Sequence, residues 1–476
     1  MMYLRLLVLC LFTSLSVAAQ DDAYRIAVNV DGYEEDFLTL GYYLMDKQYI
    51  VDTAYRSDAG DYVFRGDSAP LDPGIYLVVL SPDNNYFQFL ISDDGDQEFS
   101  LQSSTNDLGS VRAEGSDENQ LFYDYLNYLG DRQQESTVFR AVLEDSTQSA
   151  RAADARAGLE ALDRQVREYQ DRVVSLNPES FTAAIIRANQ PATPPDFADV
   201  TDNEERRTKQ WRWLQEHYFD GLDLADARLL RTPFLFQRVD YYINQLQIKH
   251  PDTLAAAIDA VLAQFDPTSE AFKYFTVHYT NEAAGSQIVG MDALYVHMVD
   301  TYYRTGKAYW SDDEQMKKMT ETADRLRPLL IGQTAPDLKM VTREGKDTSL
   351  YAIDTDYTVL YFWRYDCPAC KKSTPHMKEF YENYRDKGVT IFSVCTKGVE
   401  DLGDCWDYVD EQGTGDWVQV ADPYQRYYKE YDIKSTPTIF LLDRDKKIVS
   451  KRIGAEQLGE VVDALMQSKA AQAAGK

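Results

Sequence analysis

The feature that most constrains the fold of this chain is a pair of cysteines placed directly after an apolar run. Residues 357–363 read Tyr-Thr-Val-Leu-Tyr-Phe-Trp, and Cys367-Pro-Ala-Cys370 follows after a short connection. An apolar run rich in β-branched and aromatic side chains predicts a buried strand, and Pro368 favours the start of a helix, predicted over residues 368–387. The amides and dipole at a helix start stabilise a thiolate, which is the reactive form of cysteine. The sequence therefore predicts an α/β unit with a redox dithiol at a strand–helix junction.

Other short patterns surround this unit from about residue 329 to the C-terminus. A hairpin is predicted over residues 339–350, with its turn at Glu344-Gly345. No helix or strand is predicted between the strand that ends at residue 394 and residue 424. Strands and helices of this kind close on one mixed sheet. The other predicted elements are strands 389–394, 437–442 and 448–453 and helices near 424–431 and 457–469.

The rest of the chain divides into two further composition regimes. Residues 20–115 contain short apolar or alternating runs broken by turn signals such as Asp31-Gly32, which predicts an antiparallel, all-β sandwich-like domain. Residues 116–328 have helical spacing and many strong helix formers, which predicts an all-α middle domain. The predicted fold class is therefore multidomain, with an α/β domain over residues 329–476.

The N-terminus has the pattern of a secretory signal peptide. Arg5 precedes an apolar run over residues 6–17, and small residues lead to a predicted cleavage after Ala19. The run is shorter than the roughly 20 residues that cross a bilayer, so no membrane span is predicted. We therefore expect residues 1–19 to be removed and the protein to act in the periplasm.

Charge and cysteine usage limit the possible functions. The net charge is −29, and residues 21–115 hold 19 acidic and 5 basic residues, which argues against nucleic acid as a partner.

Cys10 would leave with the signal peptide, so all four remaining cysteines lie in the last quarter of the chain. A chain of this length does not need disulfides to build its cores. These cysteines are therefore expected to serve chemistry, and no cofactor or metal ion is predicted.

The C-terminal region resembles the thioredoxin fold in its exported TlpA/ResA-like branch. The resemblance rests on Phe362-Trp363 before the dithiol, on Pro375 in the following helix, on Ser435-Thr-Pro-Thr-Ile-Phe440, and on the stretch Ile331-Gly-Gln-Thr-Ala-Pro336. The order of the three predicted domains also resembles a multidomain family of Gram-negative envelopes.

The resemblance implies a role for each residue of the site. Cys367 would be the exposed nucleophile, and the more buried Cys370 would resolve the mixed disulfide. Pro437 would be a cis-proline that faces the dithiol and pairs its backbone with an extended substrate, and Thr436 would touch the nucleophile.

Some positions depart from the family pattern. Tyr361 stands where an acid or asparagine is common, and Ser373 where many members of the branch have glutamate, so no proton acceptor for Cys370 is identifiable. Asp366 would raise the pKa of Cys367, whereas the helix start and nearby lysines would lower it, and we expect the lowering to be larger.

Two further cysteines lie beyond the dithiol. Cys395 ends the next predicted strand, at the sheet edge where the dithiol is expected, and Cys405 follows ten residues later. They could form a structural disulfide, or a second dithiol that relays electrons to Cys367 or gates it.

The sequence thus favours an exported thiol:disulfide oxidoreductase that exchanges the Cys367–Cys370 pair with protein substrates, as a reductant supplied by an unidentified envelope electron donor. The alternative is an envelope binding or assembly protein with a dormant or structural thioredoxin domain. A peroxidase of the related peroxiredoxin fold is less favoured, because Pro-x-x-x-Thr-x-x-Cys is missing.

Overall fold

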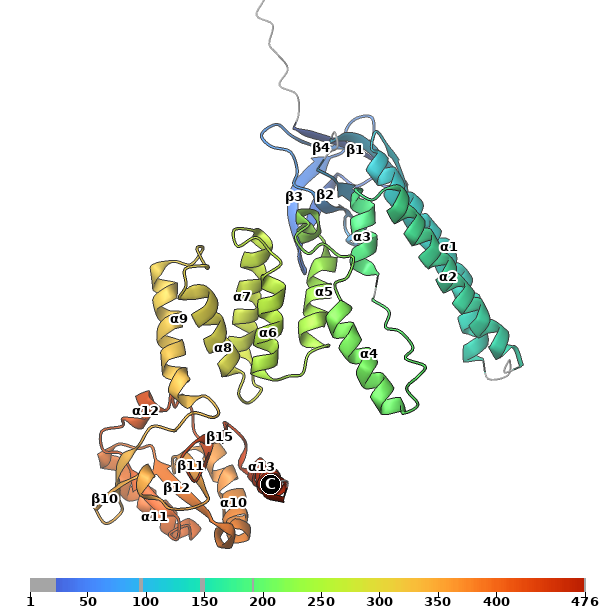
Figure 1. The fold of residues 1–476 in the computed structure, drawn as a ribbon. Coiled ribbons are helices and arrows are strands. Elements are labelled where there is room, and N and C mark those ends of the chain that lie inside the picture. The colour runs from blue at the N-terminus through green and yellow to red at the C-terminus, as the bar shows by residue number, and fades with distance from the viewer. Residues whose placement is uncertain (1–22, 94–96, 146–149, 191, 475–476) are drawn as a thin grey trace, which may run out of the picture. The chain divides into compact units, whose positions relative to one another are not determined.

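The structure is a computed structural model that describes residues 23–93, 97–145, 150–190 and 192–474 (Figure 1). These residues form two compact units that divide between Tyr242 and Ile243, and each unit is described by itself. The predicted signal peptide, residues 1–19, lies outside the described residues, and the predicted domain boundaries at 115 and 328 stay predictions.

The first unit begins with two β-sheets. The strands of these sheets are five to nine residues long and are separated by turns, as the short runs and turn signals of the sequence predicted. The strands are β1 (Tyr24–Asp31), β2 (Phe37–Leu44), β3 (Lys47–Tyr55), β4 (Tyr62–Gly66), β5 (Gly74–Leu80), β6 (Asn85–Ile91), β7 (Glu98–Ser104) and β8 (Asp107–Glu114).

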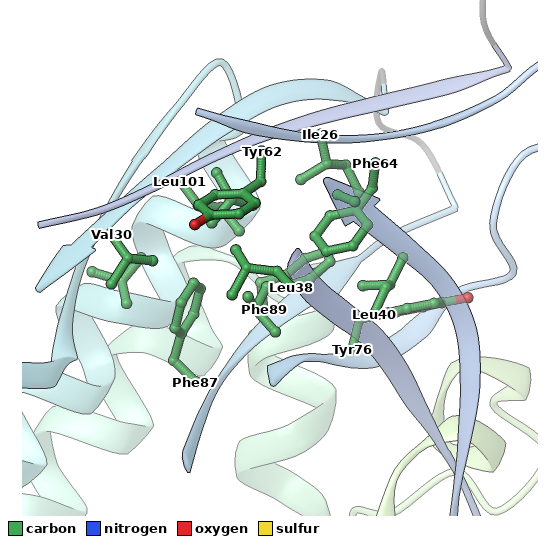
Figure 2. Packing of buried hydrophobic residues seen from close by; sticks show 14 of the residues in the cluster. Ile26, Val30, Leu38, Leu40, Tyr62, Phe64, Tyr76, Phe87, Phe89 and Leu101 are labelled. Atoms are coloured by element: carbon green, nitrogen blue, oxygen red, sulfur yellow. The ribbon is translucent and has the colours of Figure 1, made fainter. Parts of the chain in front are cut away.

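The two sheets have the strand orders β4-β1-β7-β8 and β3-β2-β5-β6, and their inner faces share one core. Figure 2 shows side chains from both sheets, among them Ile26, Phe64, Leu38 and Phe89, packed against one another. This is the predicted sandwich-like domain. The prediction of purely antiparallel pairing is wrong at one place, because β1 and β7 pair in parallel. Alternation along a strand shows which face is buried, but it does not show the direction of the neighbouring strand.

Helices follow the sandwich in the first unit. Figure 1 shows α1 and α2 side by side, and the rings of Tyr128 and Tyr169 stack between them with centroids 3.8 Å apart. Buried Asn119 joins α1 to β6, since its side chain accepts from the Leu90 amide at 2.7 Å and donates to the Leu90 carbonyl at 2.8 Å. The helices are α1 (Asp117–Glu144), α2 (Ala152–Leu176), α3 (Phe181–Asn189), α4 (Asn203–His217), the 3-10 helix η2 (Ala227–Arg231) and α5 (Pro233–Asn244), within which the units divide.

The second unit contains further helices and then the C-terminal sheet. The Lys451 ammonium, only 3% exposed in β15 (Ile448–Lys451), pairs with Asp292 at the start of α8 and donates to the Leu329 carbonyl. This buried ion pair connects a helix to the sheet within the unit. The helices before the sheet are α6 (Pro251–Leu262), α7 (Glu270–Gly285), α8 (Asp292–Met298), the π-helical turn η3 (Val299–Tyr303), α9 (Asp313–Leu326) and the 3-10 turn η4 (Arg327–Leu329).

The C-terminal sheet has the order β10-β9-β13-β12-β11-β14-β15. Its centre is β11 (Tyr357–Trp363), which is buried along its whole length between parallel β12 and antiparallel β14. Side chains of alternate residues fill two cores, one on each face of the sheet. The other strands are β9 (Lys339–Thr342), β10 (Asp347–Ser349), β12 (Val389–Cys395), β13 (Val418–Ala421) and β14 (Thr438–Asp443).

Helices cover this sheet, and together they form the predicted thioredoxin fold. The prediction missed α11 and β13, both in the stretch between residues 394 and 424 to which no element was assigned. Among the described residues, no helix is long and apolar enough to cross a membrane. The helices are α10 (Pro368–Tyr384), α11 (Leu402–Gln412), α12 (Tyr427–Glu430) and α13 (Leu458–Ala474), with 3-10 turns η5 (Leu350–Ala352), η6 (Arg385–Lys387), η7 (Val399–Asp401) and η8 (Ala455–Gln457).

Candidate active site

The two cysteines of the C-x-x-C motif lie where the central strand meets a helix. Cys367 is the N-cap residue of α10, and Pro368 occupies the first turn, where its missing amide hydrogen costs no hydrogen bond. The Cys367 sulfur accepts a hydrogen bond from the Cys370 amide, with 3.2 Å between sulfur and nitrogen. The start of α10 therefore stabilises negative charge on Cys367 directly.

The two thiols are unpaired and differ in environment. Cys367 is 6% exposed, whereas Cys370 is fully buried. Burial raises the pKa of Cys367, but hydrogen bonds from the Cys370 side chain, the Thr436 side chain and the amides of Cys370 and Ala369 outweigh it, so the pKa is lowered. Burial, followed by the hydrogen bond with Cys367, raises the pKa of Cys370 to about 12. At neutral pH Cys367 is thus the thiol that ionises more readily.

The acidic residue before the nucleophile is neutralised by its neighbours. The Asp366 carboxylate lies 3.1 Å from the Arg364 guanidinium and 3.1 Å from the Lys397 ammonium, which also pairs with Asp401 at 3.2 Å. Burial raises the pKa of Asp366, but the bond with Lys397 and the charges of Arg364 and Lys397 lower it overall. The pKa of Cys367 is lowered, as expected, and its largest lowering contributions are hydrogen bonds rather than lysine charges.

The loop before β14 faces the dithiol. The peptide bond between Thr436 and Pro437 is cis, and the Cys367 thiol donates to the Thr436 carbonyl at 3.2 Å. The sheet register explains this proximity, because Thr438 at the start of β14 pairs with Phe362 near the end of β11. The antiparallel pairing therefore brings residues 436 and 437 beside the turn that leads to Cys367.

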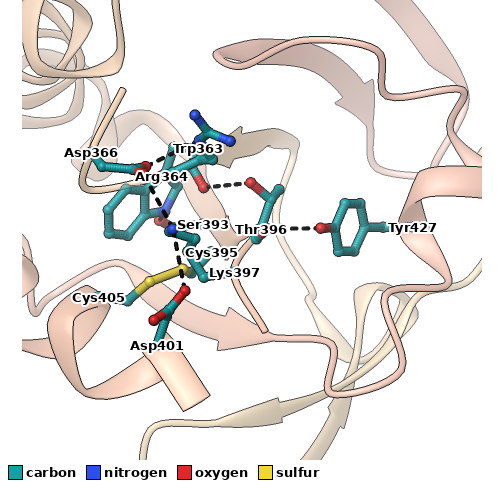
Figure 3. The surroundings of a disulfide bond; sticks show 10 residues. All are labelled: Trp363, Arg364, Asp366, Ser393, Cys395, Thr396, Lys397, Asp401, Cys405 and Tyr427. Carbon is teal, nitrogen blue, oxygen red and sulfur yellow. Dashed lines mark hydrogen bonds and ion pairs between the residues drawn. A yellow bond between two sulfur atoms is a disulfide. The ribbon is translucent and has the colours of Figure 1, made fainter. Parts of the chain in front are cut away.

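The structure joins Cys395 and Cys405 in a disulfide, shown in Figure 3. Cys395 ends β12, where it pairs in register with Trp363 of β11, and Cys405 lies in the first half of α11. Both cysteines are fully buried. The disulfide thus fastens α11 to the sheet edge that carries the dithiol.

Several residues near the dithiol were not predicted as part of the site. Lys397 follows the end of β12 and reaches Asp366, a position that the shared edge of parallel strands could have indicated (Figure 3). Tyr408 of α11 contacts the Trp363 ring with centroids 5.4 Å apart, and its hydroxyl lies 3.2 Å from the Thr374 hydroxyl. No sequence signal indicated Tyr408, because α11 itself was missed.

A mixed sheet with a dithiol at the end of its central strand and a cis-proline loop beside it defines a thioredoxin-fold thiol–disulfide oxidoreductase. Residues 331–451 match the AhpC/TSA family, and residues 176–325 match a domain of unknown function (DUF5106).

The chain is also similar to named proteins. It is 31% identical over 137 residues to thiol-disulfide oxidoreductase ResA of Bacillus thuringiensis (strain Al Hakam), which covers 29% of this chain and 77% of that protein. It is 32% identical over 132 residues to sporulation thiol-disulfide oxidoreductase A of Bacillus subtilis (strain 168), covering 25% of this chain and 74% of that protein. Among solved structures, a domain of a possible thiol-disulfide isomerase from Cytophaga hutchinsonii ATCC 33406 is 29% identical, with a TM-score of 0.29, covering 30% of this chain and 98% of that one. The protein belongs to the ResA-like family of thiol-disulfide oxidoreductases.

Proposed function

We propose that the protein is exported to the periplasm and reduces disulfide bonds in protein substrates there. Cys367 is the nucleophile, Cys370 resolves the mixed disulfide, and Thr436 and Pro437 hold the substrate chain beside them. The signal-peptide pattern of residues 1–19 supports export, and the similarity to named oxidoreductases supports the chemistry.

The reaction follows from the two thiol environments. The Cys367 thiolate attacks one sulfur of the substrate disulfide, forms a mixed disulfide, and releases the other substrate sulfur as a thiolate. Cys370 then loses its proton and attacks the Cys367 sulfur, which forms the Cys367–Cys370 bond and releases the second substrate thiolate. Two electrons pass to the substrate, and a separate envelope dithiol donor must return two electrons to the protein.

The observation that carries this proposal is the opposite shift of the two pKa values. The pKa of Cys367 is lowered, so this thiol forms the attacking thiolate, whereas buried Cys370 stays protonated with a pKa of about 12. A dithiol with a strongly stabilised thiolate is an oxidant, because its reduced form is favoured. The reducing direction is supported instead by the resemblance to the TlpA/ResA-like branch, whose members lean toward reductants.

The cis-proline loop supports a polypeptide substrate. Thr436 contacts the Cys367 sulfur through its carbonyl, so a chain joined to Cys367 would lie against this peptide. Residues 435–437 precede β14 and are not part of its ladder with β11. The Thr436 carbonyl accepts from the Cys367 thiol, and it would be released for an extended partner once Cys367 is joined to a substrate and has no thiol hydrogen.

The test is a redox titration of residues 20–476. The protein is equilibrated in thiol–disulfide buffers of graded potential, and each cysteine is trapped by alkylation and identified by mass spectrometry. We expect a reversible Cys367–Cys370 transition below about −250 mV, while Cys395 and Cys405 stay paired.

A trapping variant complements the titration. Cys370→Ser should accumulate a mixed disulfide between Cys367 and a substrate protein, whereas the matched Cys367→Ser variant should not. A titration without a Cys367–Cys370 transition would refute the proposal and favour a binding or assembly protein. A midpoint above about −200 mV would instead refute the reducing direction.

A further inference from the structure

The resolving cysteine presents a chemical problem that the two thiols alone do not solve. Cys370 is fully buried, and burial raises its pKa, yet it must become a thiolate to attack the mixed disulfide. A thiolate formed in an apolar core needs a hydrogen-bond donor, because an unpaired buried charge is strongly unfavourable. The groups around Cys370 should therefore include a donor that is free when the thiol is neutral.

Tyr361 has such a hydroxyl. It lies on β11 with its side chain on the face covered by α10, in the same buried cluster as Cys370, whereas Leu360 and Phe362 face the opposite core. The Tyr361 side chain is 1% exposed. Within the described residues, its buried hydroxyl has no hydrogen-bond partner. After burial, the charge of Cys370 is the largest influence that raises the pKa of Tyr361, so the phenol keeps its proton.

The backbone of Arg364 and the side chain of Thr436 already hydrogen-bond to Cys370 and lower its pKa, and the hydroxyl hydrogens of Thr374 and Tyr408 are used elsewhere. Thr374 donates its hydroxyl hydrogen to the Cys370 carbonyl, with 3.0 Å between the oxygens. The 3.2 Å contact between the Thr374 and Tyr408 hydroxyls must then use the hydrogen of Tyr408. The Tyr361 hydroxyl lies near that of Thr374, a contact that lowers its pKa, but within the described residues it has no hydrogen bond of normal geometry, so its hydrogen remains available.

We propose that the Tyr361 hydroxyl donates a hydrogen bond to the Cys370 sulfur as this thiol ionises to resolve the mixed disulfide on Cys367. The inference rests on the proposed function and adds a residue to it. The proton of Cys370 is released to solvent as the thiol ionises, the second substrate sulfur then leaves as a thiolate, and Tyr361 keeps its own proton throughout. Native proteins leave few buried polar atoms without a hydrogen-bond partner, and the Tyr361 hydroxyl would gain its partner when the Cys370 thiolate forms.

The variant Tyr361→Phe separates this role from a structural one. The reduced full chain is mixed with excess dithiobis(nitrobenzoate) in a stopped-flow instrument, and release of the coloured thiolate is followed. The first equivalent reports attack by Cys367, and the second reports attack by Cys370 on the mixed disulfide. We expect the first phase to stay within about twofold of wild type and the second to slow by about tenfold or more, as loss of a hydrogen bond to a charged group predicts.

The pH profile and the stability of the variant provide further readouts. The pH midpoint of the second phase should rise in Tyr361→Phe. Two other titrating groups lie near Cys370: Cys367, which raises its pKa, and Tyr408, whose own pKa the charge of Cys370 raises. The thermal unfolding midpoint should stay equal or rise, because the substitution removes an unpaired buried oxygen. A slower second phase in a protein that is no less stable would not follow from a structural role.

Tyr431→Phe is the matched control. Tyr431 is equally buried but lies in the core on the opposite face of the sheet, where its hydroxyl donates to the Pro336 carbonyl at 2.5 Å. This variant should lose stability and keep the wild-type second phase. A wild-type second phase in Tyr361→Phe would overturn the inference while the proposed function stands. A wild-type protein that releases no coloured thiolate would refute both.

Discussion

The disulfide between Cys395 and Cys405 offers a prediction whose size follows from its place in the chain. We consider the double variant Cys395→Ala, Cys405→Ala. The disulfide closes a loop with a sequence separation of 10 residues between the end of β12 and α11. Its removal frees this loop in the locally unfolded state, so the opening of α11 becomes easier.

The magnitude comes from the entropy of loop closure. For a loop of this length, the chain-entropy relation gives about 2.8 kcal/mol at room temperature. This free energy corresponds to roughly a hundredfold change in the equilibrium for local opening. Other contacts remain to hold the helix, including the Arg343–Asp410 ion pair at 2.6 Å and the bond from Lys378 to the Gln412 carbonyl at 2.7 Å. We therefore expect α11 to stay folded but to open more often.

Amide hydrogen exchange read by mass spectrometry measures this opening segment by segment. Peptides from α11 should exchange about a hundredfold faster in the variant, and peptides from the sandwich strands β1–β8 should not change. The matched control is Cys367→Ala, Cys370→Ala, which also removes two buried sulfurs but opens no closed loop. It should leave exchange of α11 within a few-fold of wild type.

Two results would contradict the reasoning. Exchange of α11 that stays within about threefold of wild type would show that the disulfide does not limit opening of the helix. Reduction of a protein disulfide should also persist within about twofold, because the dithiol itself is intact. A loss of this activity in the double variant would instead support an electron relay or gate through Cys395 and Cys405.

Two further predictions concern Cys367 and the first unit. The rate of Cys367 alkylation by iodoacetamide should reach half its maximum below the pH of about 8.5 expected for an ordinary thiol, since the pKa of Cys367 is lowered. Cys370→Ala should move that midpoint upward, because it removes a hydrogen bond to the Cys367 sulfur. A wild-type midpoint at or above about 8.5 would contradict the argument. Asn119→Ala removes the side-chain partner of the Leu90 amide and carbonyl and should lower the free energy of opening of β6 by about 2–4 kcal/mol. Hydrogen exchange of β6 measures this loss, with the exposed Gln120→Ala as the control. A loss below about 1 kcal/mol would contradict the anchoring role of Asn119.

The sequence alone predicted the elements whose signals lie in consecutive residues. The apolar run of β11, the proline at the start of α10 and the spacing of Cys367 and Cys370 belong to one short segment, so local propensity and pattern determine them. The same holds for the hairpin β9–β10, whose turn glycine Gly345 has a positive φ of 76°. The order of such segments, together with the motifs around the dithiol, carried the resemblance to the thioredoxin fold.

Elements with weak or mixed local patterns were not predicted. Gly398 lies shortly before helix α11 and Gly403 falls in its first turn, so the sequence favoured a loop there. Packing of Val409 and Cys405 in the core, together with the disulfide, stabilises the helix despite its low propensity. The parallel pairing of β1 with β7 joins strands more than 60 residues apart, which no local signal encodes.

The chemistry of the active site likewise depends partly on local sequence and partly on tertiary contacts. The sequence by itself determined that a reactive dithiol sits at a strand–helix junction, because strand, turn and helix are specified within about 20 residues. Only the tertiary structure decided what surrounds it: Lys397 against Asp366, Tyr408 against Thr374, and the free hydroxyl of Tyr361 in the same core as Cys370. These contacts join residues from different strands and helices, and they depend on sheet register and packing, which become defined only when the whole domain folds.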